Sequence, residues 1–151
     1  MAFEPYPVKT LRAGLPGLTR LVTKKIQDVP WAEFQKLQAN DILFIDSTHV
    51  LKIGSDVQYE YLEILHRLNP GVLIHLHDIF WPAEYPRKWV MTEKRFWNEA
   101  YLAQAFLAFN DSFEILWAGS YLHLNYPDKL KAAFPSYDPA KVCHGSLWLQ
   151  D

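Results

Sequence analysis

Acidic and imidazole side chains follow two apolar runs of this 151-residue sequence, at the points where the runs end. The run Ile42–Ile45 stops at Asp46, with His49 three residues later, and a second run ends in His77 and Asp78. Carboxylates and imidazoles can bind a divalent ion, and a histidine whose pKa is about 6.5 can accept a proton at neutral pH. These residue types therefore indicate a metal site, a general base, or both.

The elements that must position these side chains are two strands joined by a helix. Residues 41–46 (DILFID) are predicted to form a strand buried on both faces, and residues 71–78 (GVLIHLHD) the next strand. Between them, Ser55 and Gln58 fit a capping box that opens a helix. Two strands linked in this way lie side by side and parallel, through a right-handed crossover. The four polar side chains are therefore expected in one crevice beyond the carboxyl ends of the strands.

Other interpretations of the same residues stay open. Asp46 and Asp78 can simply cap the loops and helices that follow each strand. His75 is expected to face the opposite side of the sheet from His77, as a packed and hydrogen-bonded histidine. A metal-dependent hydrolase built on the sequence HLHD is a further alternative, and it requires one transition metal bound by both histidines.

The remaining segments continue an alternation of strands and helices. Strands are predicted within residues 18–26, 112–122 and 143–151, and helices from Pro30 and from Thr92 to about Asn110. This alternation is typical of an α/β protein with a mostly parallel sheet. The aromatic, proline-containing segment after Asp78 is expected either to pack in the core or to cover a substrate.

The composition of the chain limits the classes of partner that it can bind. The net charge of −2 and the scattered basic residues give no footprint for nucleic acid. No apolar run is long enough to span a bilayer, and the N-terminus lacks the pattern of a signal peptide, so no membrane partner and a cytoplasmic location are predicted. The chain has the length of a single domain, and its one cysteine, Cys143, is given no role.

Two further acidic positions suit a nucleoside. If a short strand ends at Phe3, Glu4 stands at its tip, where adenosine binders place a carboxylate that accepts hydrogen bonds from ribose hydroxyls. Gln27 and Asp28 follow the next predicted strand and can meet an adenine edge. No glycine-rich turn follows a first strand in this sequence.

Taken together, the segments FEPYP, QDVP, DILFIDSTHVLKIGSDV, LNPGVLIHLHDIFWPAEYP and WNEAYLAQAFL resemble the class I S-adenosylmethionine-dependent methyltransferases, in particular the group called methyltransferase family 24. The resemblance covers nearly the whole chain. It implies a Rossmann-like, mostly parallel sheet in the order 3-2-1-4-5-7-6 with the last strand antiparallel. The first strand and its glycine-rich loop have no counterpart, so residues 1–151 are expected to form a single, N-terminally truncated domain with a gap between strands two and four.

The resemblance also implies the cofactor, S-adenosylmethionine. Glu4 would hold its ribose, Gln27 and Asp28 its adenine, and Asp46 is expected to contact the cofactor as well. In related metal-dependent sugar O-methyltransferases an Asp-x-x-His motif follows the fourth strand, with the aspartate on magnesium and the histidine as base. Asp46 and His49 match this spacing.

The same enzymes have Glu-Asp after the fifth strand, where this chain has His77-Asp78. Asp46, Asp78 and His77 are therefore the expected ligands of an optional Mg²⁺, and a metal-free reaction stays open. The expected activity is methyl transfer to a small hydroxylated acceptor, with His49 and Asp46 as catalytic residues, impaired in this isolated chain. The alternative is a non-catalytic remnant or partner-binding module that forms homo-oligomers through exposed sheet edges.

Overall fold

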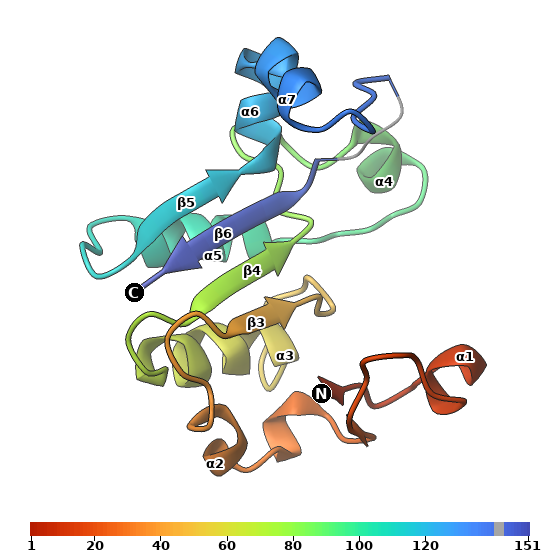
Figure 1. Cartoon of the computed structure of the whole chain (residues 1–151), viewed down its shortest axis with the longest axis vertical. Helices are drawn as coiled ribbons and strands as arrows, with labels where there is room; N and C mark the ends of the chain where they lie inside the picture. Colours follow the sequence, from red (N-terminus) through yellow and green to blue (C-terminus); the bar gives the residue numbers. More distant parts are fainter. Residues whose placement is uncertain (141–143) are drawn as a thin grey trace.

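The computed structural model describes residues 1–140 and 144–151 as a mixed α/β protein (Figure 1). Cys143 lies outside the described residues. The strands are β1 (Ala2–Phe3), β2 (Leu21–Val22), β3 (Ile42–Ile45), β4 (Leu73–His77), β5 (Glu114–Ala118) and β6 (Ser146–Gln150). The helices and helical turns are α1 (Lys9–Arg12), η1 (Ile26–Asp28), α2 (Trp31–Phe34), α3 (Asp56–Tyr59), η2 (Glu60–Ile64), η3 (Leu65–Arg67), α4 (Arg87–Met91), α5 (Glu99–Leu107), α6 (Gly119–Asn125) and α7 (Pro127–Ala133).

The strands form two separate sheets. β1 and β2 pair in parallel, and the larger sheet has the order β3-β4-β6-β5. β3 and β4 are parallel neighbours, which confirms the pairing predicted from their connecting helix. β6 runs antiparallel to both β4 and β5, so the order is the one expected for strands four, five, seven and six. No ladder joins the smaller sheet to β3 among the described residues.

One face of the larger sheet carries the core. Alternate side chains of β4 and β6 on this face, Ile74, Leu76, Leu147 and Leu149, are each at most 1% exposed. α3 and α5 lie on this side of the sheet (Figure 1). On the other face, Ile42 and Phe44 are each 53% exposed. The prediction that residues 41–46 are buried on both faces is therefore wrong, because no described element covers the second face of β3.

His75 shares this open face with His77, so the expectation that the two histidines face opposite ways is also wrong. Side chains alternate along a strand, and residues two apart project from the same face. The two rings have centroids 6.3 Å apart. The ring of His75 stacks on Trp148, and its Nε2 lies 2.9 Å from Ser146 Oγ. His75 is thus packed and hydrogen-bonded as predicted.

The helix between β3 and β4 begins where the capping residues indicate. Ser55 Oγ accepts a hydrogen bond from the Gln58 N–H at 3.1 Å. The helix then widens into the π-helical turn η2, a feature that often occurs at functional sites. η2 places Glu60 and Tyr61 inside the protein, where they are 7% and 1% exposed.

The long helix predicted from Thr92 begins instead at Glu99. Thr92 follows α4, and the residues between the two helices bond to other parts of the chain. The N–H of Asn98 donates to the His49 carbonyl at 3.0 Å, and the Asn98 side chain accepts from the Leu51 N–H at 2.6 Å. These bonds fix the start of α5 beside the loop after β3. No helix in the described ranges is long and apolar enough to cross a membrane.

Candidate active site

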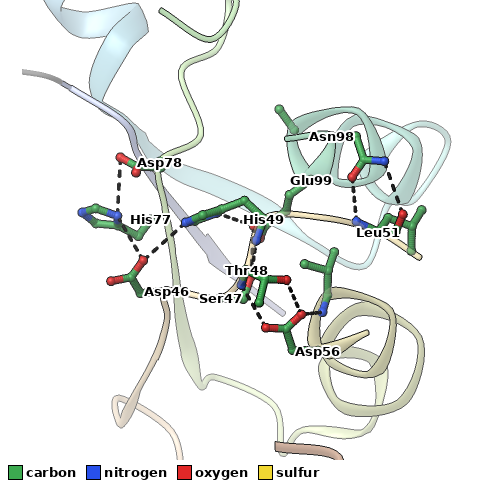
Figure 2. Close-up of polar contacts among 12 residues, drawn as sticks. Asp46, Ser47, Thr48, His49, Leu51, Asp56, His77, Asp78, Asn98 and Glu99 are labelled. Atoms are coloured by element: carbon green, nitrogen blue, oxygen red, sulfur yellow. Dashed lines mark hydrogen bonds and ion pairs between the residues drawn. The ribbon is translucent and has the colours of Figure 1, made fainter. Parts of the chain in front are cut away.

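The carboxyl ends of β3 and β4 bring four predicted polar residues together (Figure 2). Asp46 Oδ1 lies 3.4 Å from His49 Nε2 and 3.5 Å from His77 Nδ1. Asp78 Oδ1 lies 3.4 Å from the same atom of His77. The side chains of Asp46 and His77 are 53% and 41% exposed, so the crevice is open to solvent. The predicted convergence follows from the parallel pairing of the two strands.

The backbone at this edge adopts an uncommon conformation. His49 and Asp78 have φ of 58° and 56°, in the left-handed region that costs an L residue about 1–2 kcal/mol. Gly145 packs directly against Asp78, because its carbonyl accepts the Asp78 N–H at 2.6 Å and a Cβ at this glycine would lie 2.7 Å from Asp78 Cα. Strain of this kind is concentrated at functional sites.

Glu99, at the start of α5, holds the buried side of His49. Its Oε2 lies 2.7 Å from His49 Nδ1, and the two side chains are 1% and 4% exposed. Tyr61 donates to Glu99 Oε1 at 3.0 Å, and Ser47 donates to Oε2 at 3.2 Å. An ionised carboxylate only accepts hydrogen bonds, so the network assigns a proton to His49 Nδ1. His49 Nε2 then faces the crevice, beside Asp46.

The charges at this site shift several pKa values. Burial lowers the pKa of His49, but the hydrogen bond and charge of Glu99, together with the charges of Asp78 and Asp46, outweigh burial and raise this pKa. Burial also raises the pKa of Asp78, against the charges of His77 and His49.

A second buried carboxyl lies close to this network. Burial raises the pKa of Glu60 to about 8, and the charges of Glu99 and Asp56 act in the same direction. The Oε2 atom of Glu60 has no hydrogen-bond partner among the described residues. The Glu60 carboxyl is therefore largely neutral near neutral pH.

Sequence reasoning missed Glu99, Glu60 and the polar role of Tyr61. Glu99 lies within the segment WNEAYLAQAFL, which contributes to the resemblance but has no residue with an implied role. The sequence carries no signal for this role of Glu99, because the helix predicted from Thr92 places Glu99 in its interior. Its contact with His49 spans 50 residues of sequence.

Aromatic side chains form a wall on one side of His49. The ring centroid of Trp97 is 4.1 Å from that of His49, and Tyr85 and Trp89 pack edge-on against Trp97. The segment after Asp78 thus contributes to packing around the candidate base. It also borders a cavity of about 320 Å³. The residues that line this cavity are Phe80, Trp81, Pro82, Ala83, Glu84, Tyr85, Ala100, Tyr101 and Gln104.

The residues predicted to bind the ribose and adenine lie after β1 and in η1, whereas Asp46, also predicted to contact the cofactor, follows β3. Glu4 directly follows β1, and its Oε1 accepts the Tyr6 N–H at 2.7 Å. Gln27 and Asp28 belong to η1, and the Gln27 amide donates to the Gly54 carbonyl at 2.9 Å. To bind an adenosine, the side chains of Glu4 and Gln27 would have to break these hydrogen bonds and form new ones with the ligand.

The donor atoms of the crevice suit some metal ions better than others. Asp46, His49 and His77 offer ligand atoms that all lie within 4.8 Å of one another. In the described part of the chain, the candidate metal-binding group thus contains His49 where the sequence predicted Asp78. The predicted ligand set of Asp46, Asp78 and His77 stays a prediction. One carboxylate and two imidazoles do not fit Mg²⁺, which prefers oxygen ligands, whereas imidazole suits transition ions.

A protein-family model described as a methyltransferase domain matches residues 2–79. The matched range runs from β1 to just beyond β4 and contains the four polar residues of the crevice, while Glu99 lies outside it. No curated protein and no solved structure matches the chain.

Proposed function

This chain belongs to the methyltransferase domain family, and we propose that it transfers a methyl group from S-adenosylmethionine to a hydroxyl oxygen of a small acceptor. The observation that carries the proposal is the orientation of His49. Glu99 fixes Nδ1 at 2.7 Å, and Nε2 faces the crevice at the strand ends. In open parallel sheets this edge is where ligands bind.

S-adenosylmethionine, when bound, supplies a methyl group on a positively charged sulfur. His49 Nε2 would accept the proton of the acceptor hydroxyl as its oxygen takes up this methyl group, which would leave S-adenosylhomocysteine. Glu99 stabilises the imidazolium that forms, as the carboxylate does in other histidine-based sites. Asp46 orients the acceptor beside Nε2. The ring of Trp97 excludes water from one side of His49.

Cofactor binding is assigned to Glu4, Gln27, Asp28 and Asp46. The order β3-β4-β6-β5 supports the proposal of a class I, Rossmann-like domain. No glycine-rich turn follows a first strand in the sequence, so affinity is expected to be weaker than in a domain that has one. We therefore expect binding of S-adenosylhomocysteine at micromolar strength or weaker, and low activity of the isolated chain.

The test is calorimetric titration of the full chain with S-adenosylhomocysteine, followed by an acceptor screen. Glu4→Gln should weaken binding about tenfold, since it removes one charge-assisted hydrogen bond to the ribose. His49→Gln should lower methyl transfer by about 10² to 10⁴ without a comparable loss of S-adenosylhomocysteine affinity. His66→Ala, an exposed histidine in η3, is the matched control. Absence of binding at millimolar ligand would refute the proposal.

The open sheet face favours a second candidate function, in which the chain is an assembly module. Ile42 and Phe44 are half exposed on β3, an edge strand whose outer side is unpaired within the described sheet. A second copy of the chain that covers this face would bury both side chains. Sedimentation that shows a concentration-dependent dimer, together with no binding of S-adenosylhomocysteine, would favour this function over catalysis.

A further inference from the structure

We propose that Asp46, His49 and His77 form a binding site for a transition metal ion of the Zn²⁺ type, and that Glu99 fixes His49 for this purpose. The inference does not depend on methyl transfer. It differs from the magnesium site predicted from the sequence in both its ion and its ligands. Figure 2 shows Asp46 between the two imidazole rings, with its carboxylate directed at both.

The distances between donor atoms fit a tetrahedral ion. Zinc binds nitrogen at about 2.0–2.1 Å and carboxylate oxygen at about 2.0–2.2 Å, so adjacent ligand atoms are roughly 3.3–3.5 Å apart in a tetrahedron. Asp46 Oδ1 is 3.4 Å from His49 Nε2 and 3.5 Å from His77 Nδ1. All three atoms lie within 4.8 Å of one another. Small rotations of the half-exposed Asp46 and His77 side chains would close the site.

The arrangement behind His49 is that of a metal ligand. A histidine bound to a metal commonly donates its other ring N–H to a carboxylate, which fixes the tautomer and the ring orientation. His49 makes this contact to Glu99 at 2.7 Å, and Glu99 is 1% exposed. Tyr61 and Ser47 hold Glu99 in turn. His49 Nε2 is therefore presented to the crevice with its tautomer already set.

His77 provides an independent observation. Its Nδ1 atom is buried and has no hydrogen-bond partner in the part of the chain that the structure describes. Asp46 and Asp78 lie 3.5 and 3.4 Å away, beyond ordinary hydrogen-bond distance. A metal ion would satisfy this nitrogen. Asp78 or a water molecule would complete the fourth position, which is open to solvent.

Metal binding has a direct consequence for the proposed enzyme. The ion would occupy the Nε2 lone pair that His49 needs to accept a proton. Zinc binding and general-base catalysis by His49 therefore exclude each other. Zinc is expected to inhibit any methyl transfer that uses this histidine as its base.

The experiment titrates the chelator-stripped full chain with Zn²⁺ against a chromogenic chelator, and records the visible spectrum with Co²⁺. We expect one equivalent of zinc bound at micromolar strength or tighter, a tetrahedral Co²⁺ spectrum, and no displacement by millimolar Mg²⁺. Asp46→Asn and His77→Gln should each weaken zinc binding at least tenfold. Glu99→Gln should weaken it about 10- to 100-fold.

Two controls locate the site. His66→Ala tests adventitious binding by an exposed imidazole. His123→Gln tests a different histidine pair, in which the ring of His123 stacks on that of His144 with the ring centroids 4.0 Å apart. Circular dichroism verifies folding, and the exposure of Asp46 and His77 favours folded variants. No binding at about 100 μM zinc would overturn the proposal. It would also be overturned if both Asp46→Asn and His77→Gln keep the wild-type affinity, or if His123→Gln abolishes binding. S-adenosylhomocysteine binding without metal tests the methyltransferase proposal separately.

Discussion

Glu60 makes the stability of the folded chain depend on pH. Its pKa of about 8 in the folded protein exceeds the ordinary 4.5 because the carboxyl is buried, with the charges of Glu99 and Asp56 adding to the effect. Between these values the folded state holds a proton that the unfolded state has released, so stability falls as pH rises. Below pH 4.5 both states are protonated, and above pH 8 both are ionised.

The magnitude follows from the width of this window. Each pH unit between the two pKa values lowers the free energy of unfolding by about 1.4 kcal/mol, so this free energy falls by roughly 5 kcal/mol between pH 4.5 and pH 8. This is an upper figure, because a water molecule that reaches Glu60 would reduce it. The loss is large beside the about 5–15 kcal/mol by which most domains are stable. Glu60→Gln keeps the shape and removes the ionisation, so its advantage over the wild type should be small at pH 5 and should grow steadily to pH 8.

The assay is urea unfolding of both proteins at pH 5, 6, 7 and 8, followed by tryptophan fluorescence. The difference between variant and wild type at each pH cancels the contributions of the other titrating groups. Glu63→Gln is the matched control, because Glu63 is in the same helical turn and its side chain is 56% exposed. A difference that stays constant with pH, or a Glu60→Gln variant that is less stable than the wild type at pH 8, would refute the reasoning.

Three other substitutions test the packing around the site. Gly145→Ala should destabilise the chain by about 1–3 kcal/mol in urea unfolding, because its Cβ would lie 2.7 Å from the backbone of Asp78; equal stability would contradict the close approach. Tyr61→Phe should lower the free energy of unfolding by about 1–2 kcal/mol in the same assay, since it removes the buried hydrogen bond of 3.0 Å from the Tyr61 hydroxyl to Glu99. Phe44→Ser should change stability by less than about 1 kcal/mol, because the side chain is 53% exposed, and should reduce any self-association measured by sedimentation.

The sequence predicted the crevice because it depends on local signals. An apolar run, a helix cap at Ser55 and a second apolar run together determine that β3 and β4 are parallel neighbours. Parallel neighbours place the residues after each strand at the same edge, so Asp46 and Asp78 had to lie close together. The match of the family model to residues 2–79 covers this same part of the chain.

The features that sequence reasoning missed depend on long-range packing. Whether Ile42 and Phe44 are covered depends on the elements that pack on that face, and an apolar run carries no information on this. α5 begins at Glu99 and not at the predicted Thr92, because Asn98 forms hydrogen bonds with the loop after β3, across 47 residues of sequence. The same hydrogen bonds place Glu99 next to His49. They therefore explain both the observed start of α5 and the site residue that sequence reasoning missed.

The two nitrogens of His49 connect both proposals. Glu99 occupies Nδ1 in either case, and Nε2 can bind a proton or a metal ion but not both. The proposals therefore predict different responses of two variants to zinc in a methyl-transfer assay. His49→Gln should lower transfer by the same about 10² to 10⁴ with or without zinc, because it removes the base. His77→Gln should raise the zinc concentration needed for inhibition at least tenfold, because it removes a ligand of the ion and leaves the base in place. If zinc inhibits the His77→Gln variant and the wild type equally, the ion acts elsewhere, and the metal site is refuted while the assignment of His49 as base still stands.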